Sequence, residues 1–318
     1  MSKTIAFFSN QLGLRGTEIR LYNYARYNEE VLGNKSIIVS QARTNQDAVG
    51  KFKARFEVNL INSYSELEPV CKKNKADYFY ITKAGNDDGW WLRGIPTIVH
   101  VVFRVNKPHG HKYIYISDWL AKDQGYSPET HALSHIVEKP PAADYSLREQ
   151  LNIPTDATVF GCYGGLTEFN IRFVQEAVID TVSKNKNIYF ILMNINKFGA
   201  DHDQIKHLPG TYDLNQKAAF VEATNAMIHA RKGGETFGMA VAEFSISNKP
   251  VLTYADSGER AHIELLGDRG IYYRNKAEVS DIFTNLSKYI KHDDYYKCYN
   301  QFTPRNIMTK FNSLLDYE

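Results

Sequence analysis

Residues 232–251, KGGETFGMAVAEFSISNKPV, contain two glutamates eight positions apart, Glu235 and Glu243. The stretch opens with a Gly-Gly pair that permits a sharp turn, and it closes with Asn-Lys-Pro and a short apolar run. We expect a helix to begin near Thr236 or Phe237, with a strand directly behind it. A loop, a helix and a strand in this order are half of a βαβ unit, which predicts a parallel sheet.

The same alternation extends outward in both directions along the chain of 318 residues. Strands are expected at residues 4–9, 35–40, 56–62, 76–82, 95–102 and 112–117, and again at 157–165, 186–195, 226–232 and 249–255. Helices are expected at residues 17–33, 63–75, 169–185 and 215–225. Strands that alternate with helices indicate parallel sheets covered by helices.

Paired prolines in EKPPAADYS, residues 138–146, interrupt this rhythm and mark a linker. The sequence therefore predicts an α/β protein with two doubly wound Rossmann-like domains, 1–140 and 141–302, that face a central cleft. In such sheets ligands bind beyond the carboxyl ends of the strands.

Composition narrows the class of protein further. Hydrophobic residues make up 43% and charged residues 23%, which is ordinary for a globular protein. No apolar run approaches the roughly 18 residues that span a bilayer, and the short apolar run at the start is better explained as a strand than as a signal peptide. Cys71, Cys162 and Cys298 lie far apart without a CxxC motif, which is typical of reduced thiols in a cytoplasmic protein.

The chemistry of the opening stretch depends on its two carboxylates and the helix between them. A helix start attracts an anion, while carboxylates accept hydrogen bonds from hydroxyl groups. Glu243 would lie roughly 9 Å along the helix. A nucleotide-sugar meets both demands, because it carries sugar hydroxyls at one end, ribose hydroxyls at the other and a diphosphate between them. The alternative is a capping glutamate followed by a solvated one.

GETFGMAVAEFSISNKPV also resembles the signature of retaining GT-B glycosyltransferases of the family-four type, in which two glutamates flank seven residues. The matching positions are Glu235, Phe237, Gly238, Glu243, Pro250 and Val251. Three further segments resemble the same family: LGLRGTEIRLYNYARY with Gly13 and Gly16, KYIYISDWLAKDQGY, and LREQLNIPTDATVFGCYGGL. Together they cover most of the chain.

The resemblance implies a division of labour between the domains. The second domain would bind the nucleotide-sugar donor, and the first would bind a glycan, lipid-linked or other acceptor. Glu235 would hold the donor sugar, Glu243 the ribose, and the N–H groups from Thr236 through Gly238 to Met239 the leaving diphosphate. Members of the family transfer the sugar with retention and without a protein nucleophile. We expect no cofactor, and no metal because helix ends and basic groups can neutralise the leaving diphosphate. The helix at 303–318 would return to the first domain.

One departure from the family concerns the diphosphate. The family places an arginine, and later a lysine, after the first strand of the second domain, but this chain has Gly165 at the first position and Asn170 or Ile171 near the second. We therefore expect backbone N–H groups at Gly164, Gly165 and Gly234 to contribute, with Arg231 supplying charge. A solvated Arg231 is the alternative.

His100 ends an apolar strand, so we expect it at the carboxyl edge of the first sheet. In the family a histidine from a comparable loop reaches the donor sugar, which makes His100 a second catalytic candidate. The alternative is a histidine at the edge of the core, bonded to the backbone.

Charge is unevenly distributed along the chain. Residues 1–140 carry a net charge of +5 and residues 141–318 carry −3. A basic first domain suits an anionic acceptor or peripheral contact with an anionic membrane, and an ordinary fluctuation of charge explains it equally well. No basic stripe with interleaved aromatic residues predicts nucleic-acid binding.

Two other functions remain open on the sequence. One is another GT-B enzyme, a nucleotide-sugar epimerase or a sugar phosphorylase. The other is a non-catalytic protein that binds a nucleotide-sugar, which the missing arginine and lysine favour.

Overall fold

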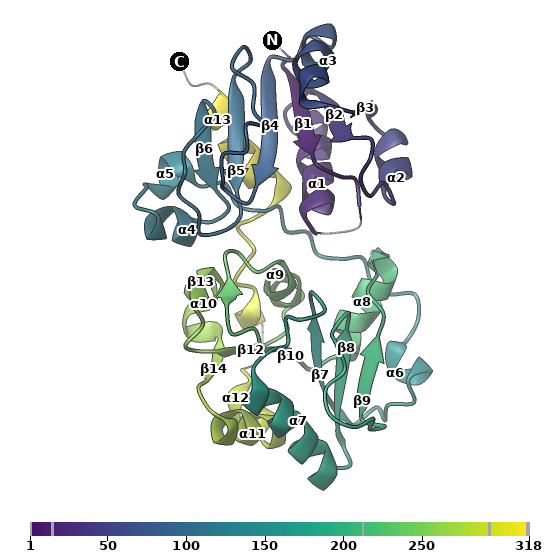
Figure 1. The fold of residues 1–318 in the computed structure, drawn as a ribbon. Coiled ribbons are helices and arrows are strands. Elements are labelled where there is room, and N and C mark those ends of the chain that lie inside the picture. The colour runs from purple at the N-terminus through teal and green to yellow at the C-terminus, as the bar shows by residue number, and fades with distance from the viewer. Residues whose placement is uncertain (1, 14–15, 212, 292–293, 316–318) are drawn as a thin grey trace. The chain divides into compact units, whose positions relative to one another are not determined.

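The protein consists of two compact α/β units (Figure 1). The computed structural model describes residues 2–13, 16–211, 213–291 and 294–315. Unit one comprises residues 1–136 and 302–318, and unit two comprises residues 137–301. Within the described ranges no helix combines the length and apolar character needed to cross a membrane.

A parallel sheet forms the centre of unit one. Its described strands are β1 (Thr4–Ser9), β2 (Lys35–Gln41), β3 (Glu57–Ile61), β4 (Tyr78–Lys83), β5 (Thr97–Val101) and β6 (Lys112–Tyr115). They lie in the order β3-β2-β1-β4-β5-β6. The chain builds outward from β1 to β3 and then returns to pair β4 with β1, so the direction of winding reverses between β1 and β4.

Helices cover the sheet of unit one, where strands such as β1 and β2 are buried on both faces. They are α1 (Gly16–Glu30), α2 (Val49–Lys53), α3 (Leu67–Lys73), which continues the short turn η1 (Tyr64–Glu66), α4 (Asp118–Asp123), α5 (Pro128–His131) and α13 (Pro304–Leu315). The last of these returns from the end of the chain to the core of unit one, where the ring of Phe311 packs against Phe7, Tyr24 and Tyr80.

Unit two repeats the plan with a second parallel sheet. Its described strands are β7 (Thr158–Tyr163), β8 (Ile188–Met193), β9 (Ile205–Leu208), β10 (Ala226–His229), β12 (Val251–Tyr254) and β14 (Ile271–Tyr273). They lie in the order β14-β12-β10-β7-β8-β9, so winding reverses between β7 and β10. A separate two-stranded ladder joins β11 (Gly234–Glu235) to β13 (Glu259–Arg260).

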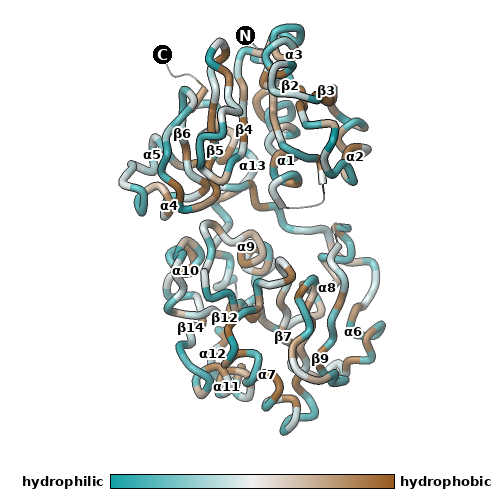
Figure 2. Tube along the Cα trace, in the orientation of Figure 1, coloured by the Kyte–Doolittle hydropathy of each residue, from teal (hydrophilic) through white to brown (hydrophobic). Residues whose placement is uncertain are grey.

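The helices of unit two lie on both faces of its sheet (Figure 1). They are α6 (Leu147–Gln150), α7 (Arg172–Lys184), α8 (Leu214–Ala223), α9 (Met239–Ile246), α10 (Ala261–Leu266), α11 (Lys276–Thr284) and α12 (Leu286–Tyr289), with short turns η2 (Gly267–Arg269) and η3 (Asp294–Tyr296). On one face α7, α11 and α12 bury Phe283 against Phe160 and Phe190. On the other, Phe220 of α8 packs against Phe244 of α9. Figure 2 shows hydrophobic residues along strands such as β7 and β12 and hydrophilic residues in many of the loops.

The predicted alternation is confirmed, since a strand or helix lies at each expected range. The short strands β9 and β14 and several short helices were not predicted, because elements of three to six residues carry little periodicity. The expected start of the helix in the opening stretch was wrong. Its first residue is Met239, because Gly238 adopts a left-handed conformation with φ of 88° and separates Thr236 and Phe237 from the helix.

Candidate functional site

The candidate site of unit two lies at the carboxyl ends of β7 and β10. These strands are neighbours, and winding reverses between them, which is where doubly wound sheets bind ligands. Gly164 and Gly165 directly follow β7, and the loop that begins at Arg231 follows β10. The structure thus brings Gly164, Gly165, Arg231 and the stretch at residues 232–251 to one edge of the sheet.

Two glycines shape the path of the chain between β10 and α9. Gly234 has φ of +77°, and a Cβ atom there would meet the Glu259 carbonyl oxygen at 2.0 Å, so the β11–β13 ladder accepts only glycine at this position. At Gly238 a Cβ atom would lie 3.3 Å from Cβ and Cγ of Glu235. The missing side chain at Gly238 therefore lets Glu235 pack against the start of α9.

The carboxylate of Glu235 has two basic neighbours. His229, the last residue of β10, lies with Nε2 3.2 Å from Glu235 Oε1, and Arg231 donates from Nη1 to Oε2 at 3.0 Å. On its other side Arg231 donates through Nε to the carboxylate of Glu168. The guanidinium already neutralises carboxylates of the protein, so a diphosphate would have to compete for it.

A chain of hydrogen bonds holds the ring of His229 on the side away from Glu235. Its Nδ1 lies 2.8 Å from the Thr253 hydroxyl, which in turn lies 3.0 Å from Nε2 of His262. His262 is fully buried, and burial, together with the positive charges of the neighbouring basic groups, lowers its pKa well below the usual range. A neutral His262 thus supports a network that holds Glu235 in one orientation.

The protonation state of Glu235 follows from this setting. Burial raises the pKa of its carboxyl, but the hydrogen bond and charge of His229 and the positive charge of Arg231 outweigh burial and lower the pKa below its ordinary value. Its side chain remains 23% exposed. Glu235 is therefore a fixed carboxylate that a ligand can reach.

Glu243, in the middle of α9, has different partners. The Tyr163 hydroxyl, at the end of β7, donates to Oε2, and Lys217 of α8 donates to Oε1 at 2.9 Å. Nζ of Lys217 also lies 5.0 Å from the centre of the Tyr163 ring. Burial and the charge of Glu243 raise the pKa of Tyr163 well above its usual range, so its hydroxyl stays protonated. Ribose hydroxyls would share Glu243 with these two donors.

The remaining predicted donor contacts lie between the two glutamates. Thr236 is partly exposed, whereas Phe237 is buried and its carbonyl accepts a hydrogen bond of 3.0 Å from Tyr299. Gly238 and Met239 form the start of α9, where the first N–H groups of a helix lack carbonyl partners within it. These groups are available to an anion at the helix start.

Comparison with solved structures identifies the architecture. HepE from Anabaena, solved with UDP, superposes with a TM-score of 0.71 at 16% identity, covering 99% of this chain and 99% of that chain. A glycosyltransferase from Rickettsia africae gives 0.67 at 13% identity, covering 99% and 96%. A Listeria monocytogenes protein named as a UDP-N-acetylglucosamine 2-epimerase gives 0.64 at 15%, covering 99% and 95%.

The fold is GT-B. The predicted fold class of two Rossmann-like domains is thereby confirmed. No protein-family model matches the sequence. No curated protein matches it either. At these sequence identities the likeness establishes the GT-B fold alone. The activity has to be argued from the residues of the site.

Three of the predicted site residues, Gly13, Gly16 and His100, belong to unit one. Gly13 lies in the buried loop after β1, and Gly16 opens α1. His100, the penultimate residue of β5, is fully buried, with Nδ1 2.5 Å from the Tyr80 hydroxyl, and burial lowers its pKa to about 3. This burial favours the alternative of a histidine in the core, although the hydrogen bond of Nδ1 is to a tyrosine side chain and not to the backbone.

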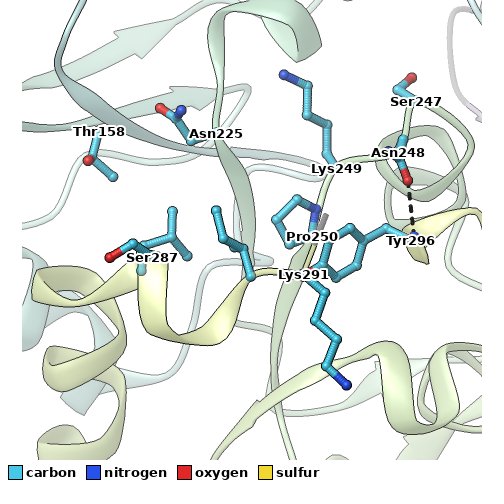
Figure 3. Close-up of a pocket in the computed structure, with 11 residues that line it drawn as sticks. Thr158, Asn225, Ser247, Asn248, Lys249, Pro250, Ser287, Lys291 and Tyr296 are labelled. Carbon is cyan, nitrogen blue, oxygen red and sulfur yellow. Dashed lines mark hydrogen bonds between the residues drawn. The ribbon is translucent and has the colours of Figure 1, made fainter. Parts of the chain in front are cut away.

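A pocket of about 520 Å³ lies at the opposite edge of the sheet in unit two (Figure 3). It is lined by Thr158 and Asn225, at the amino ends of β7 and β10, and by Lys249 and Pro250 before β12. Nζ of Lys249 donates to the carbonyl of Thr224 at 2.5 Å, so its charge already stabilises the end of α8. This pocket is separate from the glutamates.

Sequence reasoning missed most partners of the two glutamates. His229 offered a signal, because it is a polar residue at the end of a buried strand. Glu168 and Lys217 offered none, since each lies in a segment far along the chain from its partner. Among the described residues no three His, Cys, Asp or Glu side chains are grouped so as to hold a metal ion.

Proposed function

We propose that this protein is a glycosyltransferase that moves a sugar from a nucleotide-sugar to an acceptor with retention at the transferred carbon. The observation that supports this most directly is the edge of β7 and β10 in unit two, where a fixed carboxylate, a helix start and a second carboxylate follow one another along the chain. The GT-B fold agrees with it, and HepE, of the same fold, was solved with UDP and with UDP-glucose.

In this proposal the reacting sugar lies near Glu235 and the diphosphate at the start of α9. Positive charge develops on the sugar ring in the transition state, and a fixed carboxylate nearby stabilises it more than the ground state. The N–H groups around Gly238 and Met239 stabilise the leaving diphosphate. The leaving phosphate then assists deprotonation of the acceptor.

Lys217 takes part of the role of the missing arginine and lysine. Its side chain is 18% exposed, and its ammonium group lies beside the ring of Tyr163, the residue that precedes Gly164. When ribose hydroxyls donate to Glu243, Lys217 is released toward the α-phosphate, so one ion pair is exchanged for another. No metal ion is required if helix N–H groups and Lys217 balance the charge.

The test is thermal unfolding with a panel of nucleotides and nucleotide-sugars that includes UDP and UDP-glucose, because a ligand of the folded state raises the melting temperature. The best binder is then followed for release of nucleotide with and without candidate acceptors. Release that requires an acceptor supports transfer. Binding with no turnover under any condition contradicts catalysis and leaves a binding protein.

A second candidate is a nucleotide-sugar epimerase, favoured by the likeness to the Listeria monocytogenes protein. An epimerase would act without an acceptor, and its products include an isomeric sugar. The same incubation, analysed for sugar isomers in the absence of acceptor, separates the two enzymes.

A further inference from the structure

Arg20 carries a positive charge that has no ion-pair partner among the described residues of unit one. It lies in the second turn of α1, and its Nε and Nη1 atoms are both buried without a hydrogen-bond acceptor. Within the part of the chain that the structure describes, it makes no ion pair. Buried charged groups are almost always paired, so this arginine requires an explanation.

The neighbouring polar groups are occupied with one another. Glu18, two positions earlier, accepts hydrogen bonds from Gln11 at 3.2 Å and from Thr17 at 2.9 Å. Tyr24 donates to the carbonyl of Ser134 at 2.6 Å. None of these hydrogen bonds brings a carboxylate into contact with the guanidinium.

Electrostatics supports the same conclusion. Burial lowers the pKa of Arg20 to about 10, despite the attraction of Tyr80, Tyr24 and Glu18. Burial and the charge of Arg20 together lower the pKa of His100 to about 3 and that of His135 well below its usual range. Both histidines are therefore neutral at pH 7, and Arg20 is the cation of this cluster.

The cluster lies where a ligand can approach. α1 follows the carboxyl end of β1, and His100 lies next to the carboxyl end of β5, so the cluster is at the ligand-binding edge of the sheet. Although two of its nitrogens are buried, Arg20 as a whole is partly exposed. An anionic group can thus reach the guanidinium from outside unit one.

We propose that Arg20 is the centre of an anion-binding site in unit one that takes a singly charged oxyanion, a carboxylate or a phosphodiester. The histidines and tyrosines around Arg20 are neutral, and Glu18 is hydrogen-bonded to Gln11 and Thr17 without forming an ion pair with Arg20, so the guanidinium can pair with one anionic group. A planar guanidinium matches the spacing of both oxyanions. If the proposed transferase function holds, the anion belongs to the acceptor, whereas the site itself does not depend on that function.

The experiment measures thermal unfolding of three proteins: wild type, Arg20→Met, and the matched control Arg26→Met. Arg26 lies on the same helix but pairs with Glu30 at the surface. Each is unfolded in sodium glucuronate, sodium dimethyl phosphate and sodium chloride at equal ionic strength. We expect both organic anions to raise the melting temperature of wild type and Arg26→Met above that in chloride. Arg20→Met should bind at least about tenfold more weakly.

A second readout comes from the chloride arm alone. Removing an unbalanced buried charge should leave Arg20→Met at least as stable as wild type. Arg20→Lys keeps the charge without the planar group and should show a reduced response. A response to glucuronate alone assigns the site to carboxylates, and one to dimethyl phosphate alone assigns it to phosphodiesters.

Equal responses of wild type and Arg20→Met to both anions overturn the proposal, and so does an Arg20→Met protein that is unfolded or clearly less stable than Arg26→Met. Binding of UDP-glucose, measured on the same variants, keeps the two proposals separate. It should be unchanged by Arg20→Met. Its absence from wild type would count against the transferase and leave the anion response as a test of Arg20.

Discussion

The two units surround a partly buried arginine in opposite ways. In unit two, Arg231 lies between the carboxylates of Glu168 and Glu235, and Lys217 lies against Glu243. In unit one, Arg20 has two buried nitrogens with no acceptor. At the edge of unit two each of these charged groups therefore has a partner of opposite charge before any ligand arrives, which suits a ligand recognised largely through hydroxyl groups. In the proposed site of unit one, the guanidinium of Arg20 gains such a partner only when an anion binds.

The largest effect of a substitution on activity is expected at Glu235, the carboxylate that pairs with His229 and Arg231. Glu235→Gln keeps the shape of the side chain and removes its charge, so the rate of transfer should fall on the order of 10²- to 10³-fold, the size of one preorganised electrostatic contact. Bare nucleotide should bind almost as before, because its contacts lie at α9 and Glu243. Release of nucleotide from the best donor is the measurement, and Glu264→Gln, at an exposed position of α10, is the control. Loss of nucleotide binding would show that Glu235 lies at the other end of the donor.

Glu243 tests whether the second ion pair of unit two also serves the ligand. Glu243→Ala should weaken binding of donor and bare nucleotide alike by about 10- to 150-fold, since each charged hydrogen bond is worth ~1.5–3 kcal/mol. Titration calorimetry with UDP and the best donor measures it, beside Lys217→Met. If Glu243 merely holds Lys217 in place, Glu243→Ala and Lys217→Met will lose the same affinity. The double variant will then bind no more weakly than either single variant.

Stability provides the direct contrast between the arginines. Arg231→Met removes the ion-pair partner of Glu168 and leaves Glu235 with His229 alone, so it should lower the free energy of unfolding by ~1–3 kcal/mol. Arg172→Met, at an exposed ion pair on α7, should change it by less than about 0.5 kcal/mol. Arg20→Met should cause no loss. Urea unfolding of the three variants at pH 7 measures this order, and a loss at Arg20 as large as that at Arg231 would erase the contrast.

The pH dependence of stability should be the smallest effect. Because the folded-state pKa of Glu235 is lowered, its ion pairs stabilise the protein fully above the ordinary glutamate pKa near 4.5, and this contribution is lost as pH falls through the lowered value. Glu235→Gln should make the free energy of unfolding depend less steeply on pH on this acid side. The contribution of Arg20 to stability has the opposite sign. Because its folded-state pKa is lowered, the charged form of Arg20 destabilises the folded protein. Urea midpoints between pH 3 and 7 for wild type and Glu235→Gln provide the comparison.

Much of the fold could be read from the sequence because it is encoded locally. Apolar runs between turn residues placed the longer strands and the helices between them, and parallel strands fix which ends share an edge. This brought Gly164, Arg231 and Glu235 to one edge without any knowledge of contacts. The start of α9 was misplaced by two or three residues, because the left-handed conformation of Gly238 depends on the close packing of Glu235 against it.

What the tertiary structure alone decided is which charges meet. Glu168 and Arg231 are 63 positions apart, and Lys217 and Glu243 are 26 apart, so no periodic pattern connects them. The burial of His100 likewise follows from α1 and α13 closing over the sheet, which a strand pattern does not specify. Sequence patterns encode local conformation through repeated spacing. An ion pair, or an arginine left without one, depends on how distant segments pack.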